Sequence, residues 1–320
     1  MFSSLMAGSN HTCGVETGTG KAWCWGYGVF GQLGDGYERN ASEPVTVLGD
    51  KVFASLAAGT GHTCGVEAST GAAWCWGWNG QGQLGVGKIG SSGDSVFPVR
   101  VMGEIGFSSV VAGWTQTCGV EAGAGSAWCW GGNYAGQLGD GSDRDMSVAP
   151  AAVTGGRVFS SLAGRGSHTC GIETGTGKAW CWGVNIRGEL GDGTVDQGPQ
   201  YGKSSPVTVT GGRVFTSLVA GESHTCGVEA GTGKAWSWGA NTQGQLGDGT
   251  VDHASPYGKS SPVMVTGGIV FSSLVAGYAH TCGVEAGTNA VWCWGWNSAG
   301  QLGDGTTADR TGPVAVIHVN

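Results

Sequence analysis

One sequence motif recurs along the whole chain with small changes: H-T-C-G-[VI]-E, then A-W-C-W-G, then G-Q-L-G-D-G. The first cysteines of its six copies are Cys13, Cys64, Cys118, Cys170, Cys226 and Cys282, at spacings of 51, 54, 52, 56 and 56 residues. Such a period holds about four short strands with their turns. We therefore expect a repeat protein in which each copy forms one supersecondary unit.

Within the first copy, residues 2–8, 11–16, 21–26 and 44–48 are typical of strands separated by glycine-rich turns. No segment has a helical hydrophobic period. Repeats of four antiparallel strands at this spacing favour an all-β fold, a six-bladed β-propeller with one blade per copy. The sequence thus predicts a single domain spanning residues 1–320.

The two ends of the chain suggest how such a propeller closes. Internal repeats run from a P-V strand into an F-x-S-L strand, as at 206–218, whereas the first copy begins at Phe2 and the chain finishes with P-V-A-V-I-H-V-N at 313–320. We expect the C-terminal strand to pair beside the N-terminal strand and seal the six blades.

Composition excludes several other classes of protein. The chain has 66 glycines, but also 15 tryptophans and 40% hydrophobic residues, which argues against both collagen and disorder. A formal net charge of −8 argues against a nucleic-acid partner. No apolar stretch is long enough to insert in a membrane, and the first residues do not form a signal peptide.

The repeated residues also resemble a known family. H-T-x-G-[VI], W-G-x-N and G-Q-L-G-D-G, seen at 62–66, 75–79 and 82–87 with Val86 in place of Asp, are similar to the regulator of chromosome condensation repeat. This resemblance covers all six copies and implies a β-propeller. Members are usually seven-bladed, so an incomplete seven-bladed ring is the alternative. The family implies a fold more firmly than an activity.

A four-residue turn at 17–20 places Gly14 opposite Trp23 and Cys13 opposite Cys24 across the hairpin. The same arithmetic holds in every copy, so a tryptophan always faces a glycine, and we expect the indole to cover the bare backbone there. The W-x-W tryptophans are expected to pack between blades. They are Trp23, Trp25, Trp74, Trp76, Trp128, Trp130, Trp180, Trp182, Trp236, Trp238, Trp292 and Trp294.

The opposed cysteines favour disulfides, because directly opposed strand positions lie about 4.5 Å apart at Cα, within bonding range. The fifth copy has Cys226 opposite Ser237. Five pairs would indicate an oxidising, extracellular or periplasmic location, whereas free buried thiols would indicate the cytoplasm. The expected pairs are Cys13–Cys24, Cys64–Cys75, Cys118–Cys129, Cys170–Cys181 and Cys282–Cys293.

A soft-metal site is the alternative role for these cysteines, since His11 shares a strand face with Cys13 and Cys24. The position opposite His11 is Gly26, however, and we expect no metal and no cofactor. The repeated histidines are interpreted as structural hydrogen-bonding residues: His11, His62, His168, His224 and His280. No catalytic motif is present, and the aspartates of the G-D-G turns are expected to cap their own backbone, so we predict no enzyme.

The copies differ mainly in loops on one face of the predicted propeller, where several copies carry aromatic residues. Two interpretations stay open: the aromatic side chains pack the long loops onto the blades, or they form a surface that binds a protein partner. Tyr201 and Tyr257, in the near-identical insertions at 194–205 and 250–261, could rim this face. The candidate binding residues are Tyr27, Phe30, Trp78, Trp114, Tyr134, Tyr278 and Trp296.

These observations favour an exported, monomeric, non-enzymatic propeller of bacterial origin that binds another protein. The resemblance adds inhibition as a subtype, because the family includes a secreted bacterial inhibitor of β-lactamase. It also implies two alternatives. One is nucleotide exchange on the small GTPase Ran, and the other is ultraviolet sensing, for which G-W-T-Q-T at 113–117, with Trp114, approaches the family's tryptophan motif.

Overall fold

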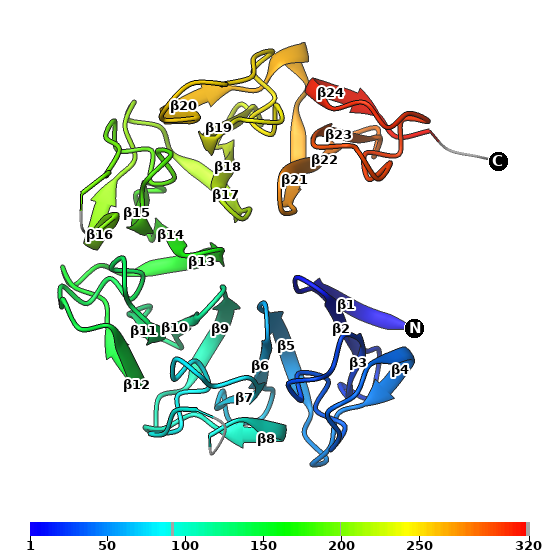
Figure 1. The fold of residues 1–320 in the computed structure, drawn as a ribbon, viewed down its shortest axis with the longest axis vertical. Coiled ribbons are helices and arrows are strands. Elements are labelled where there is room, and N and C mark those ends of the chain that lie inside the picture. The colour runs from blue at the N-terminus through cyan, green and yellow to red at the C-terminus, as the bar shows by residue number, and fades with distance from the viewer. Residues whose placement is uncertain (91–92, 199, 318–320) are drawn as a thin grey trace. The chain divides into compact units, whose positions relative to one another are not determined.

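The computed structural model describes residues 1–90, 93–198 and 200–317 and contains six four-stranded antiparallel sheets (Figure 1). Its helical content in these residues is one short 3₁₀ turn, η1 (Thr266–Gly268). The chain is a six-bladed β-propeller, which confirms the fold predicted from the repeats. Blade one is β1–β4, and each later blade takes the next four strands. None of the described residues form a helix with the length and apolar character needed to cross a membrane.

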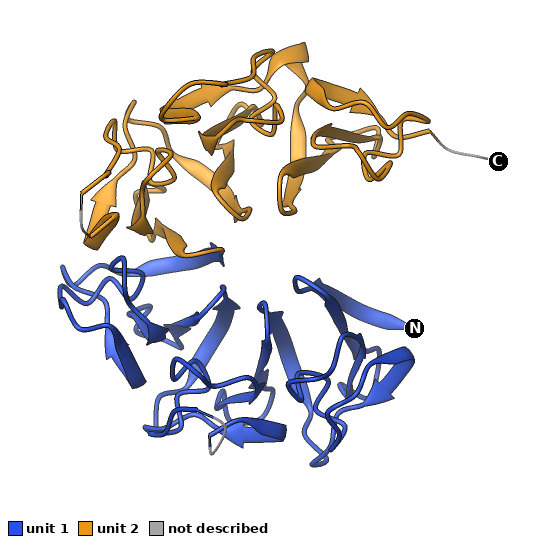
Figure 2. Ribbon diagram, in the orientation of Figure 1, with its two compact units in different colours: residues 1–165 blue, residues 166–320 orange. Residues whose placement is uncertain are grey.

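The chain divides into two compact units, residues 1–165 and 166–320 (Figure 2). The strands of unit 1 are β1 (Phe2–Ala7), β2 (His11–Glu16), β3 (Ala22–Gly26), β4 (Ala41–Thr46), β5 (Phe53–Ala58), β6 (His62–Glu67), β7 (Ala73–Gly77), β8 (Ser95–Arg100), β9 (Phe107–Ala112), β10 (Gln116–Glu121), β11 (Ala127–Gly132), β12 (Met146–Ala152) and β13 (Phe159–Arg165). The strands of unit 2 are β14 (His168–Glu173), β15 (Ala179–Val184), β16 (Gly202–Thr208), β17 (Phe215–Ala220), β18 (His224–Glu229), β19 (Ala235–Ala240), β20 (Gly258–Met264), β21 (Phe271–Ala276), β22 (His280–Glu285), β23 (Val291–Gly295) and β24 (Arg310–Ala315).

The predicted hairpin register is confirmed in blade one. Cys13 pairs with Cys24 and Gly14 with Trp23 across β2 and β3. The fourth strand, expected at 44–48, instead covers Ala41–Thr46. Its earlier start follows from a register shift between Cys24 and Gly26, after which Gly26 pairs with Ala41. Such an irregularity lengthens one strand relative to its partner, and residue spacing did not reveal it.

The expected pairing of the C-terminal strand with the N-terminal strand, which joins residues of the two units, stays a prediction. β24 pairs with β23, and β1 pairs with β2, so each blade is built from four consecutive strands. In blade one, β4 pairs with β3 and completes a sheet of four consecutive strands. Of the segment expected to close the propeller, 318–320 lie outside the described residues.

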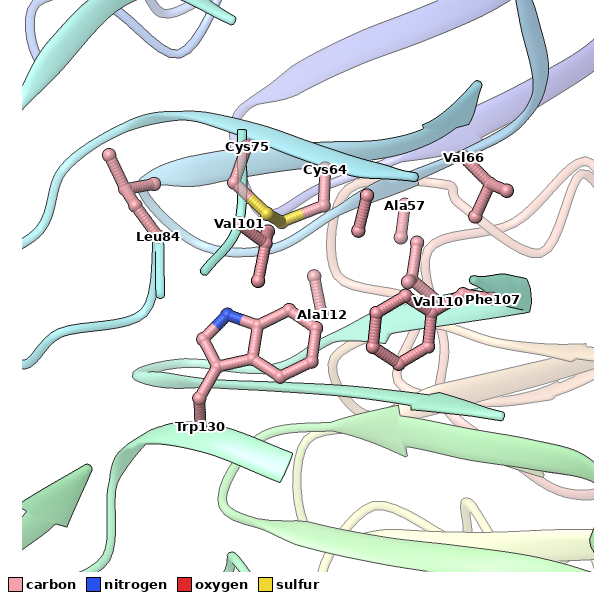
Figure 3. Close-up of a cluster of buried hydrophobic side chains, with 11 residues drawn as sticks. Ala57, Cys64, Val66, Cys75, Leu84, Val101, Phe107, Val110, Ala112 and Trp130 are labelled. Atoms are coloured by element: carbon pink, nitrogen blue, oxygen red, sulfur yellow. A yellow bond between two sulfur atoms is a disulfide. The ribbon is translucent and has the colours of Figure 1, made fainter. Parts of the chain in front are cut away.

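The hydrophobic core lies between consecutive blades. In unit 1 the Cys64–Cys75 side of blade two packs on Phe107 and Trp130 of blade three (Figure 3). In unit 2 the side of blade four that carries Cys170 packs on Trp238 of blade five in the same way. We call these two sides of a blade its cysteine face and its tryptophan face. Blades two and five thus have two apolar faces, unlike a sheet with one solvated side, because neighbouring blades of the same unit cover both faces.

A phenylalanine and a leucine of the first strand lie closest to the strand glycine of blade two. A Cβ built on Gly65 would lie 2.5 Å from the ring of Phe53 and 2.8 Å from Leu56, while Trp74 is its cross-strand partner as predicted. The Phe53 ring then contacts the fully buried Trp76, with centroids 5.8 Å apart. Trp74 is half-buried, and Lys51 lies over its ring at 4.0 Å.

Candidate partner-binding surface

Three of the predicted binding residues form a contiguous row of side chains in unit 1. The ring centroids of Tyr27 and Phe30 lie 5.9 Å apart, and those of Phe30 and Trp78 lie 6.4 Å apart. Tyr27 and Phe30 are exposed, and Trp78 is half-buried. The sequence predicted these residues from two aligned loop positions, and the structure brings them together across two blades.

Main-chain hydrogen bonds hold the three residues at the loop positions. The amide of Tyr27 donates to the Asn10 carbonyl at 2.8 Å, and the amide of Trp78 donates to the Gly61 carbonyl at the same distance. The amide of Phe30 donates to Gln32 Oε1 at 2.9 Å. Because the main chain is anchored by these hydrogen bonds, the loops keep their conformation without burying the three aromatic side chains.

The row continues toward Trp114 through the turn at 59–61. A Cβ on Gly61 would lie 3.3 Å from Trp78 and 3.5 Å from Phe30, while the neighbouring Thr60 amide donates to the carbonyl of Gly113 at 3.3 Å. Trp114, which follows Gly113 in the G-W-T-Q-T segment, is 42% exposed. We call Tyr27, Phe30, Trp78 and Trp114 the aromatic surface.

Tyr134 is exposed in the loop that follows β11, in the same unit. In unit 2, Tyr278 is exposed in the turn between β21 and β22, and Trp296 is exposed directly after β23. The prediction that these residues bind the same partner as the aromatic surface stays a prediction.

A hollow of about 640 Å³ adjoins the aromatic surface at Tyr27. Its other lining residues include Asn10, Asn40 and Ser42, all exposed, so amide and hydroxyl groups stand beside the phenol ring. Asn40 Oδ1 accepts a hydrogen bond from the main-chain amide of Gly28 at 3.1 Å, and this bond fixes the orientation of the Asn40 side chain. Binding surfaces often combine these residue types: aromatic side chains supply contact area, and neighbouring Asn and Ser side chains supply adaptable hydrogen bonds.

Four of the repeated histidines, His11, His62, His168 and His224, form hydrogen bonds with a threonine of the next blade. His11 Nε2 lies 2.8 Å from Thr63 Oγ1, and this hydroxyl donates to the carbonyl of Gln32, so the His11 ring is the donor in the first contact. Burial lowers the pKa of His11 to about 4 and that of His62 to about 3. In the described residues no cluster of three or more metal-ligating side chains occurs. A buried, neutral histidine that donates from Nε2 fits the structural interpretation.

The predicted cysteine pairs are bonded in the structure, with Cα atoms 4.0–4.1 Å apart. Cys226 is a buried free thiol, and the hydroxyl of Ser237 donates to its sulfur at 3.0 Å. Burial raises the pKa of Cys226 to about 11, so this thiol is unreactive at neutral pH.

One buried titratable residue escaped the sequence interpretation. Glu189 replaces the glutamine of the G-Q-L-G-D-G loop in copy four, and it is 1% exposed. Its Oε2 accepts the amide of Arg187 at 2.8 Å, while Oε1 has no hydrogen-bond partner among the described residues. Burial raises the pKa of Glu189 to about 7. The sequence does carry a sign of this residue: the motif reads G-E-L-G-D-G at 188–193, with glutamate in place of glutamine.

The two insertions in unit 2 each carry one exposed tyrosine. Tyr201 and Tyr257 both have left-handed backbone, with φ of 53° and 62°. Gln197 Nε2 donates to Ser255 Oγ at 3.1 Å and so joins the two insertions. Residue 199 lies outside the described residues.

Comparison with known proteins identifies the family. The model of the regulator of chromosome condensation (RCC1) repeat matches residues 19–66, 70–120, 232–284 and 289–320, more than half of the chain. The chain belongs to the RCC1 repeat family. A second model of the same repeat matches residues 53–83, 215–245 and 271–301.

Relatives of this RCC1-repeat chain have different functions. The ultraviolet-B receptor of Arabidopsis thaliana is 30% identical over 98% of this chain and 69% of its own length. The structure of human WBSCR16 aligns with a TM-score of 0.84 at 20% identity, over 99% of this chain and 82% of that one. Prp20p from Saccharomyces cerevisiae, whose binding to Gsp1p and histones has been described, aligns with a TM-score of 0.82 at 20% identity, over 98% and 76%. At this identity the structures establish the fold.

Proposed function

We propose that this propeller acts by binding a protein partner through the aromatic surface, without catalysis. The contact of Tyr27, Phe30 and Trp78 in an exposed row is the observation that carries the proposal. Tyrosine and tryptophan are the usual energetic anchors of protein interfaces, and exposed apolar clusters on a soluble protein commonly mark such sites. The hollow beside Tyr27 adds polar groups at the rim of this row.

The rigid support of these side chains favours binding over internal packing of the loops. Each of the three residues is anchored through its main-chain amide, so the loop conformation does not depend on burying the aromatic side chain. Removing a side chain from the aromatic surface should therefore leave the blades intact. A preformed surface also binds at a smaller cost in conformational entropy.

The test is an affinity capture with the full chain and two sets of variants. Phe30→Ala and Trp114→Ala remove exposed side chains of the aromatic surface, and Phe97→Ala removes an exposed side chain of β8 as the matched control. We expect a partner that the native chain and Phe97→Ala retain and that both surface variants lose, with unchanged unfolding midpoints. Retention of the same proteins by all four chains would contradict the proposal.

We further propose that the protein works in an oxidising compartment, which the five bonded cysteine pairs support. Trapping thiols by alkylation at the moment of cell lysis tests this location. One reactive thiol after denaturation, that of Cys226, is the expected result. Eleven reactive thiols would place the protein in a reducing compartment instead.

A further inference from the structure

The tryptophans of the aromatic surface differ from the other tryptophans of blades two and three in their hydrogen bonding. In these two blades, four indole Nε1 groups donate to protein oxygens at 2.9–3.4 Å, those of Trp74, Trp76, Trp128 and Trp130. For Trp78 and Trp114, none of the described residues supplies an acceptor. An indole N–H can only donate, so these two groups are available to a ligand that brings hydrogen-bond acceptors.

The parts of the loops and turns that carry the aromatic surface contain no charged residue. These segments are 27–33, 59–61, 78–84 and 113–115. The equivalent segments of blades four and five, in contrast, carry Arg187, Glu189 and Glu222. A charged segment docked over the aromatic rings would lose its hydration without gaining an ion pair. Charge complementarity therefore favours a partner segment that is itself uncharged.

The rings of the aromatic surface follow one another in a row and do not enclose a pocket. The centroid spacings are 5.9 Å from Tyr27 to Phe30 and 6.4 Å from Phe30 to Trp78. A polyproline II helix rises about 3.1 Å per residue, so two of its residues cover each spacing. An extended ligand can contact the whole row, whereas a compact ligand would contact only one or two rings.

We propose that the aromatic surface binds a proline-rich segment of its partner in the polyproline II conformation, an inference that rests on the proposed function. Proline rings supply uncharged apolar surface for Phe30 and Trp78. Proline has no backbone N–H, and polyproline II has no internal hydrogen bonds, so the segment presents carbonyl acceptors to the indole groups of Trp78 and Trp114. The conformation is formed before binding, which lowers the entropy cost.

Isothermal titration calorimetry of the full chain with a blocked deca-proline peptide tests the proposal. A blocked Gly-Ser peptide of the same length is the control ligand, because it is a flexible coil. We expect the native chain and Phe97→Ala to bind deca-proline alike, and Phe30→Ala and Trp114→Ala to bind it at least about tenfold more weakly. These side chains are exposed, so the folds should hold, and circular dichroism checks this.

A conservative variant separates the indole N–H from the ring. Trp114→Phe keeps an aromatic ring and removes the donor, so it should weaken deca-proline binding by about three- to tenfold, the loss expected for one hydrogen bond. Deca-proline should also release the partner that the native chain retains in affinity capture, and the Gly-Ser peptide should not.

The outcomes distinguish this inference from the proposed function. Absence of saturable deca-proline binding at millimolar concentration overturns the inference, as does equal binding of the Gly-Ser peptide or equal binding by Phe30→Ala and Trp114→Ala. If these two variants lose the captured partner but deca-proline neither binds nor releases it, the proposed function stands and the proline-rich segment is wrong. Retention of the partner by both variants contradicts the proposed function, and this inference with it.

Discussion

The indole Nε1 of Trp76 donates a hydrogen bond of 2.9 Å to the main-chain oxygen of Gln32, one blade earlier. Thr63 Oγ1 donates to the same oxygen at 2.8 Å. In unit 2 the carbonyl of Glu189 accepts the equivalent pair of bonds, from Trp238 and Thr225. Consecutive blades within each unit are therefore joined by two hydrogen bonds to one main-chain carbonyl. Because the acceptor is a main-chain oxygen, the loop residue that carries it can be glutamine, as at Gln32, or glutamate, as at Glu189.

We predict that Trp76→Phe lowers the free energy of unfolding by about 2–3 kcal/mol, because it removes a buried hydrogen bond and leaves a small cavity. Urea denaturation of the native and variant chains measures this loss. Phe97→Leu is the control, since Phe97 is exposed on β8, and it should cost less than about 1 kcal/mol. Equal losses at the two positions would contradict the assigned role of the interface.

Acid should weaken the fold through its buried histidines. The pKa of His62 is about 3 in the folded chain against an ordinary value of 6.5, so between these pH values the unfolded chain binds more protons. The free energy of unfolding must then fall as pH falls through this window, by up to about 1.4 kcal/mol per pH unit for one such group. His62→Gln should flatten this slope, measured by urea denaturation at a series of pH values.

Blade three supplies the control for that experiment, because Gln116 already occupies the histidine position there and is buried. The replacement is thus compatible with the blade interface, and His62→Gln should remain folded at pH 7. An unchanged pH slope in this variant would show that His62 is not the titrating group.

Glu189 should have the opposite pH dependence. Its pKa is about 7 in the folded chain against an ordinary 4.5, so the folded chain binds more protons and stability is lost as pH rises through this range. Glu189→Gln should raise the free energy of unfolding by roughly 2–3 kcal/mol at pH 8 and by much less at pH 4. Denaturation at these two pH values measures the difference.

The reciprocal change, Gln83→Glu, tests the same explanation in unit 1. Gln83 is the equivalent residue of blade two and is fully buried. Placing a carboxyl group there should create a loss of stability above neutral pH. A variant as stable at pH 8 as the native chain would refute burial as the cause of the raised pKa of Glu189.

Ser237→Cys should complete the set of cross-strand disulfides. Ser237 pairs with Cys226 in the register that the bonded pairs adopt in the other blades. The new bond should add about 2 kcal/mol to the free energy of unfolding, as expected for a short closed loop, and should reduce the thiol count after denaturation from one to zero. A reductant should abolish the gain, and Cys226→Ser should show no such dependence at this site.

Much of the fold could be predicted from repetition. The motif period gave the number of blades, and the turn at 17–20 gave the pairing of Cys13 with Cys24. The start of β4 could not be predicted, because the register shift after Cys24 depends on how the long loop returns to the sheet. Of the candidate site, the identity of the aromatic residues was predictable from loop positions that differ between copies.

The sequence by itself determined the strands, the hairpin register and the residues that vary between blades, because these follow from turn lengths and from comparison of the copies. Only the tertiary structure decided what each residue faces. It placed Phe53 and Leu56 against Gly65, brought Phe30 beside Trp78, and buried Glu189. The physical reason is that these contacts form between strands or blades far apart in sequence, whose separation is set by side-chain packing and not by the local pattern of residues.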